Sequence, residues 1–144
     1  MKITIFTSNQ PRHISLVNDL SNIADEVFCI QECNTVFPGV TKDFFSKSET
    51  MKIYFEQVKR AEEKYFGQPS FFNKNVRSMA IKSNDLSNMR MPVLQECLES
   101  DIYIVFGASF IRGWLIEFLE ANRALNIHMG LSPFYRGSSC NFWA

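Results

Sequence analysis

The sequence contains no long run of apolar residues. Its first nine residues read Met-Lys-Ile-Thr-Ile-Phe-Thr-Ser-Asn, and their apolar stretch is too short for the hydrophobic region of a signal peptide. No other run approaches the roughly 18 apolar residues that a membrane-spanning helix requires. We therefore expect a cytoplasmic protein without a membrane partner.

An excess of charge of either sign is also missing. Fifteen basic residues balance fifteen acidic ones, and the sequence pI is about 6.7. Such a balance gives no electrostatic reason to expect nucleic acid as an obligate partner. A tRNA held through a local basic patch stays open.

Cysteine is sparse, and its spacing matches neither a zinc site nor a redox Cys-x-x-Cys pair. The four cysteines are Cys29, Cys33, Cys97 and Cys140. They are interpreted as reduced, buried or incidental thiols, with a metal site or a disulfide as the alternative. No metal is expected. The loop after the first predicted strand also lacks G-x-G-x-x-G, which disfavours a dinucleotide-binding enzyme.

What the chain does have is enough apolar bulk for one globular domain: 46% of its 144 residues are hydrophobic, and fourteen are Phe. Residues 2–6 alternate like a strand, and apolar positions recur at helical spacing over 14–24. A short apolar run over 26–30 predicts a second strand. Strand, helix and strand in this order are typical of a parallel sheet.

The remainder continues this pattern. Further strands are predicted at 76–82, at the apolar run 102–106 and at 124–127, and helices at 51–65, 92–98 and 111–119. Ser46 and Glu49 resemble a capping box before the long helix. The apolar stripe of that helix is interpreted as a packing face, made of Met51, Tyr54, Phe55, Val58, Ala61 and Tyr65. The fold class is therefore α/β, a mostly parallel sheet flanked by helices.

Ligands of open parallel sheets bind outside the carboxyl ends of the strands. Asn126 and His128 lie at such an end, two positions apart, so that both side chains can project to one side. An amide can donate a hydrogen bond to a developing oxyanion, and an imidazole can move a proton near neutral pH. On spacing alone, a purely structural histidine remains the alternative.

The longer string around this pair carries more information. Leu125-Asn-Ile-His-Met-Gly-Leu-Ser-Pro-Phe-Tyr-Arg-Gly137 resembles the signature of the folate-dependent formyltransferases, which is Asn-x-His, a Ser-Leu-Leu-Pro-like loop and then Tyr-Arg-Gly. That family includes glycinamide ribonucleotide, methionyl-tRNA and sugar N-formyltransferases. The resemblance is strong over residues 102–144 and limited to element order over 1–35. Met129 and Gly130 depart from the family pattern.

The resemblance implies a Rossmann-like, formyltransferase-type N-terminal domain over residues 1–144 that transfers a formyl group from 10-formyltetrahydrofolate to an amine. Asn126 and His128 would be its catalytic residues. Ser109, Phe110 and Ile111 would bind the formyl donor, partly through backbone groups. The acceptor would be a small-molecule amine, with an amino sugar favoured over methionyl-tRNA because the chain offers no basic surface.

The loop after the first strand supplies the remaining candidates. Asn9 and Arg12 are predicted to bind substrate, because Arg12 and His13 precede a helix whose free N–H groups could meet a phosphate. A plain exposed loop is the alternative. The acidic residues Glu96, Glu99 and Asp101 are interpreted as a solvated helix end.

The family's third catalytic residue is an Asp some thirty to forty residues beyond the His, and no acidic residue occurs after His128 here. The sequence therefore predicts an incomplete domain, inactive alone, that self-associates through its truncated edge. The competing hypothesis is a non-catalytic folate-binding or interaction remnant.

Overall fold

The computed structural model describes residues 1–40, 42, 47–130 and 134. Strands and helices alternate along the chain, which confirms the predicted α/β class. The strands are β1 (Lys2–Ser8), β2 (Glu26–Cys33), β3 (Val76–Lys82), β4 (Ile102–Phe106) and β5 (Leu125–Asn126). The helices are α1 (Pro11–Ser21), α2 (Glu49–Phe66), α3 (Met91–Leu94) and α4 (Trp114–Ala121), with short 3-10 turns η2 (Leu86–Asn88) and η3 (Gln95–Leu98).

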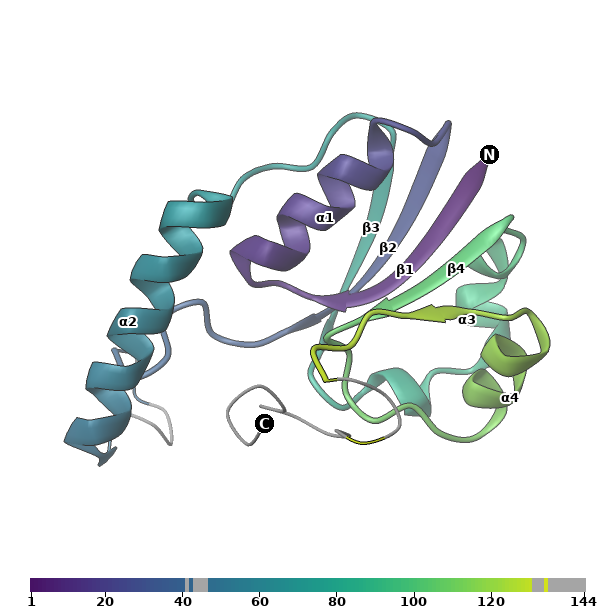
Figure 1. Cartoon of the computed structure of the whole chain (residues 1–144). Coiled ribbons are helices and arrows are strands. Elements are labelled where there is room, and N and C mark those ends of the chain that lie inside the picture. Colours follow the sequence, from purple (N-terminus) through teal and green to yellow (C-terminus); the bar gives the residue numbers. More distant parts are fainter. Residues whose placement is uncertain (41, 43–46, 131–133, 135–144) are drawn as a thin grey trace.

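The five strands form one parallel sheet in the order β3-β2-β1-β4-β5 (Figure 1). In the central strand, Ile5 is paired with Cys29 on one side and Ile104 on the other. The chain therefore builds the sheet outward from β1 in one direction, and then returns to add β4 and β5 on the other side. The strand order therefore reverses between β1 and β4, and in open α/β sheets ligands bind outside the carboxyl ends of the strands at such a point.

Successive strand residues point to opposite faces, so the sheet has a core on each side. Figure 1 shows α1 on one face and α3 with α4 on the other. The core on the α1 side consists of Ile3, Ile5, Val17, Val27, Cys29 and Ile104. The core on the α3 and α4 side includes Phe6, Phe28, Ile30, Leu86, Leu94, Tyr103, Leu115 and Leu119.

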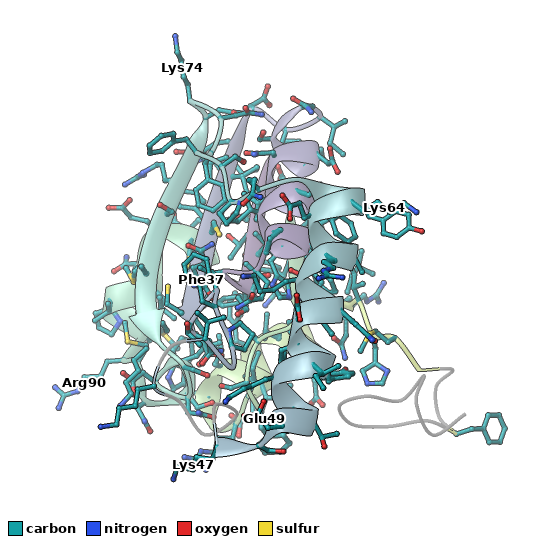
Figure 2. All side chains as sticks on the ribbon, turned by 90° about the vertical axis from the view of Figure 1, so that its left-hand side faces the viewer. Phe37, Lys47, Glu49, Lys64, Lys74 and Arg90 are labelled. Carbon is teal, nitrogen blue, oxygen red and sulfur yellow. The ribbon has the colours of Figure 1, made fainter. Side chains whose placement is uncertain are left out.

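The helix α2 differs from its prediction, because no residue of it is buried. Of the predicted stripe, Met51, Phe55 and Val58 are half-buried, whereas Tyr54, Ala61 and Tyr65 are exposed, so only part of the expected face packs. The reason is its position: α2 lies along the outside of the molecule against α1, with Glu49 and Lys64 near its two ends (Figure 2). Its N-cap is Ser48, whose Oγ accepts a hydrogen bond from the Met51 N–H at 3.4 Å. The predicted cap, Ser46, lies outside the described residues.

Other element boundaries shift by a few residues. The first helix begins at Pro11, which suits the first helical turn because that position needs no N–H donor. The strand β2 continues to Cys33, beyond the predicted end at residue 30. The helix α4 begins at Trp114 and not at residue 111, because Gly113 has φ +67°, outside helical geometry. Over the part of the chain that the structure describes, no helix has the length and apolarity to cross a membrane.

Candidate functional site

The carboxyl ends of the strands bring together segments that are distant in sequence. Among them are residues 9–10 after β1, Glu32 near the end of β2, residues 107–111 after β4, and the segment after β5 that contains His128. All these ends lie at one edge because every strand pairing is parallel. The predicted candidates are therefore brought to a single edge of the sheet.

Asn126 and His128 both have exposed side chains at this edge. Asn126 is paired with Val105 of β4, and the next residue, Ile127, donates its N–H to the Val105 carbonyl at 2.9 Å. Nδ1 of His128 lies 3.1 Å from the Gly130 N–H and 3.4 Å from the Gly130 carbonyl oxygen, so the backbone of Gly130 holds the ring at this nitrogen. Neither side chain is in an apolar core, where the predicted chemistry would be impossible.

The loop Ser109–Ile111 directly follows β4, the strand beside β5. Its residues differ in burial: Ser109 is half-buried, Phe110 is 85% exposed, and Ile111 packs against the core. The hydroxyl of Ser87 fixes the loop from one side, because it donates to the Phe110 carbonyl at 3.2 Å and accepts the Arg112 N–H at 3.0 Å. The Phe110 ring is therefore presented to solvent by an anchored backbone.

Glu32 is a member of this site that the sequence reasoning missed. Its carboxylate is buried, at 1% exposure, and its Oε1 accepts the N–H of Asn84 at 2.8 Å and the N–H of Leu86 at 3.4 Å. From the loop after β4, the Ser109 hydroxyl reaches Oε1 at 2.8 Å and the Ser109 N–H reaches Oε2 at 2.5 Å. One carboxylate thus joins the loops after β3 and β4. The sequence contains no distinct signal for Glu32, because Glu26 and Gln31 are polar residues of the same strand.

His13 is the second residue that was misjudged, since it is buried and not part of an exposed loop. Its Nδ1 accepts the Gln10 N–H at 3.2 Å, and its ring packs edge-on against Phe106. Burial, together with the adjacent positive charge of Arg12, lowers the pKa of His13 to about 3. The ring is therefore neutral at physiological pH, and Nε2 is the one buried side-chain polar atom without a partner among the described residues.

Asn9 and Arg12, the predicted substrate ligands, are both engaged by the protein. The Asn9 amide donates to the Asn34 carbonyl at 2.7 Å and accepts the Asn34 N–H at 3.0 Å. Arg12 forms an ion pair with Glu62 of α2. The Asn9 contacts fasten the loop after β1 to the loop after β2, and the Arg12 ion pair joins α1 to α2. A substrate would have to compete with them.

Comparison with known proteins adds no assignment. No family model, curated protein or solved structure matches the chain. The site must be interpreted from its own residues and from the sequence resemblance.

Two hollows in the described part of the chain lie away from this edge. One, of about 750 Å³, is at the amino ends of the strands, where ion pairs join Lys2 to Glu26 and Arg77 to both Glu26 and Glu96. The other, of about 250 Å³, lies between β3 and the α3 region. Glu96, Glu99 and Asp101 have exposed side chains, as predicted for a solvated segment. Within the described residues, no cluster of potential metal ligands occurs.

Burial governs the chemistry of the cysteines as well. It raises the pKa of Cys29 to about 12 and that of Cys97 to about 11, and it also raises the pKa of Cys33. All three are free thiols. Cys140 and the loop residues 131–133 and 135–137 lie outside the described residues.

Proposed function

We propose that this protein is a formyltransferase of the folate-dependent type, which passes a formyl group from 10-formyltetrahydrofolate to a primary amine. The observation that carries the proposal is the string from Leu125 to Gly137, with Asn126 and His128 as its Asn-x-His pair. The resemblance places this pair after a strand at the carboxyl edge of a parallel sheet. That arrangement agrees with the exposed positions of both side chains here.

The chemistry needs few protein groups. The amine attacks the formyl carbon, the carbonyl oxygen becomes an oxyanion, and the bond from carbon to N10 of the folate then breaks. The amine loses one proton, and N10 gains one. In this scheme the Asn126 amide donates a hydrogen bond to the oxyanion, and His128 transfers the proton.

The Ser109–Ile111 loop would receive the formyl donor. It follows β4 and lies next to the β5 end, so a ligand over this loop would have its reactive group near Asn126 and His128. Phe110 adds an exposed aromatic face for a flat heterocycle. A small-molecule amine, such as an amino sugar, is the proposed acceptor, because the net charge of zero gives no general attraction to tRNA.

The direct test is a transfer assay that follows tetrahydrofolate release from 10-formyltetrahydrofolate, with amino sugar nucleotides, glycinamide ribonucleotide and methionyl-tRNA offered in parallel. The assay uses the chain extended by a segment that carries the acidic residue implied by the resemblance, since the chain alone is predicted to be inactive. In that protein, Asn126→Ala and His128→Ala should each lower kcat/KM by about 100-fold or more, as expected for oxyanion and acid–base groups. Met129→Ala is the matched control, since Met129 is an exposed neighbour.

A separate binding measurement decides between transfer and simple folate binding. Calorimetric titration with 5-formyltetrahydrofolate, a stable isomer with the same pterin ring, reports donor binding without turnover. Binding without transfer to any acceptor would favour a folate-binding module. If the protein shows no binding and no transfer, the proposed function is overturned.

A further inference from the structure

The most unusual buried group in the described chain is the Glu32 carboxylate. A buried carboxylate loses its hydration, and this cost must be offset by a counter-ion or by hydrogen bonds. Glu32 makes no ion pair with any described residue and instead accepts four hydrogen bonds. The donors are Asn84 and Leu86, after β3, and Ser109, after β4, so every donor lies beyond the carboxyl end of a strand.

The two carboxylate oxygens have different partners. Oε1 accepts hydrogen bonds from the Asn84 and Leu86 N–H groups and from the Ser109 hydroxyl. Oε2 accepts one from the Ser109 N–H alone. An ionised carboxylate is the only side chain of this size that offers two acceptor oxygens. The position of the Ser109 peptide group therefore depends on the second oxygen.

The hydrogen bond from the Ser109 N–H to Glu32 also determines which backbone groups of the loop remain for a ligand. The Ser109 N–H is taken by Glu32, and the Phe110 carbonyl is taken by Ser87. The Phe110 and Ile111 N–H groups make no hydrogen bond within the described chain. They lie on a loop that is fixed on one side by a buried carboxylate and on the other by a hydroxyl.

We propose that Glu32 is the positioning residue of the donor-binding loop: it orients Ser109 so that the following peptide groups meet the ligand. The proposal rests on the proposed function for the identity of that ligand, a reduced pterin with donors and acceptors on its ring edge. Glu32 does not touch the ligand and acts only through Ser109.

Glu32→Gln is the sharpest variant, because it keeps the size of the side chain. If the amide oxygen stays on the Asn84 and Leu86 side, the amide nitrogen faces the Ser109 N–H, and two donors oppose each other. The Kd for 5-formyltetrahydrofolate should rise roughly tenfold, and hydrogen exchange of the Ser109 amide should become roughly tenfold faster. In the wild type, bound ligand should slow hydrogen exchange of the Phe110 and Ile111 amides. Exchange of the Ser109 amide should be slow with or without the ligand.

Two further variants separate positioning from stability. Val17→Ala removes buried apolar volume on the opposite face of the sheet, so it lowers stability without touching the loop. Its Kd should stay within about twofold of the wild type at a temperature where it is fully folded. Ser87→Ala loosens the loop from its other side and should weaken binding in the same direction as Glu32→Gln. If Glu32→Gln does not fold, Ser87→Ala tests whether an anchored loop backbone is needed for ligand binding.

An unchanged Kd in Glu32→Gln, or an equal loss in Val17→Ala, would overturn the positioning role. If the wild type does not bind 5-formyltetrahydrofolate, the proposed function fails. Hydrogen exchange of the Ser109 amide then tests by itself whether Glu32 controls the loop. Faster exchange at Ser109 in Glu32→Gln sustains the control of the loop by Glu32, and unchanged exchange overturns it.

Discussion

The imidazole ring of His13 packs so closely against the backbone of Gly107 that a Cβ on Gly107 would lie 2.3 Å from Nε2. Gly107 also has φ +72°, a conformation that other residues rarely adopt. The contact joins the start of α1 to the end of β4, where the strand order reverses. Backbone and imidazole ring are in direct contact there, with no space for a side chain on residue 107.

Gly107→Ala should be strongly destabilising. We expect a loss of about 2–4 kcal/mol in the free energy of unfolding, from left-handed backbone strain and from overpacking against His13. Gly67→Ala is the matched control, because Gly67 has φ +78° but nothing within 4 Å of an added Cβ. Its loss should come from backbone strain alone, about 1–3 kcal/mol, because φ +78° with ψ −165° is adopted almost only by glycine, and it should be smaller than that of Gly107→Ala. Denaturant unfolding measures both, and equal losses would contradict the role of the His13 contact.

The double variant His13→Ala/Gly107→Ala tests the same contact from the other side. Without the ring, the added methyl group has space, so the cost of Gly107→Ala should fall by about 1–3 kcal/mol in a double-mutant cycle. Strict additivity of the two single changes would show that the strain at Gly107 is independent of His13.

The pKa of His13 makes stability depend on pH. The folded pKa is about 3, below the unfolded value of 6.5, so the unfolded state binds more protons between these values. The stabilisation is complete above pH 6.5 and is lost as the pH falls toward 3. From pH 7.5 to 5, His13 alone should remove about 2 kcal/mol from the free energy of unfolding.

His13→Gln provides the comparison, since it cannot titrate in this range. Urea unfolding at both pH values should show a smaller acid loss in the variant, by about the same 2 kcal/mol. Parallel pH profiles for the two proteins would mean that His13 is accessible to protons in the folded state.

Thiol reactivity should follow burial. Cys33 is partly exposed, whereas Cys29 and Cys97 are buried with pKa values of about 12 and 11. Alkylation of the folded protein at pH 8 should therefore modify Cys33 at least about tenfold faster than either buried thiol. Peptide mass spectrometry measures the three rates, and denaturant should remove the difference. Fast labelling of Cys29 under native conditions would contradict its place in the core.

The stability of α2 should depend on its cap, because none of its residues is buried. Ser48→Ala removes the side chain that accepts the Met51 N–H, and it should destabilise the first turn of the helix by about 0.5–1 kcal/mol. Hydrogen exchange of the amides in that turn reports the effect. Ser46→Ala, which removes the cap indicated by sequence spacing, should leave the exchange unchanged. The reverse result would restore the predicted capping box.

The sequence alone predicted much of the fold. The strands at 76–82 and 102–106 have the predicted bounds, because the backbone period of two and a continuous apolar run are local signals. The parallel arrangement followed from strands that alternate with helices. Asn126 and His128 were found as a pair at a strand end, because their spacing and their neighbours are also local.

Only the tertiary contacts decided which polar side chains are buried and which helix face stays exposed. Glu32 and Ser109 are 77 positions apart, and nothing in the pattern around either residue indicates that one will bury its charge against the other. His13 lies in the first turn of α1, where polar residues are common, and only the packing of α1 against the end of β4 buries it. Likewise, α2 carries an apolar stripe, but its position outside α1 leaves part of that stripe in water. Periodicity tells which face of an element is apolar, whereas burial depends on what the rest of the chain places against that face.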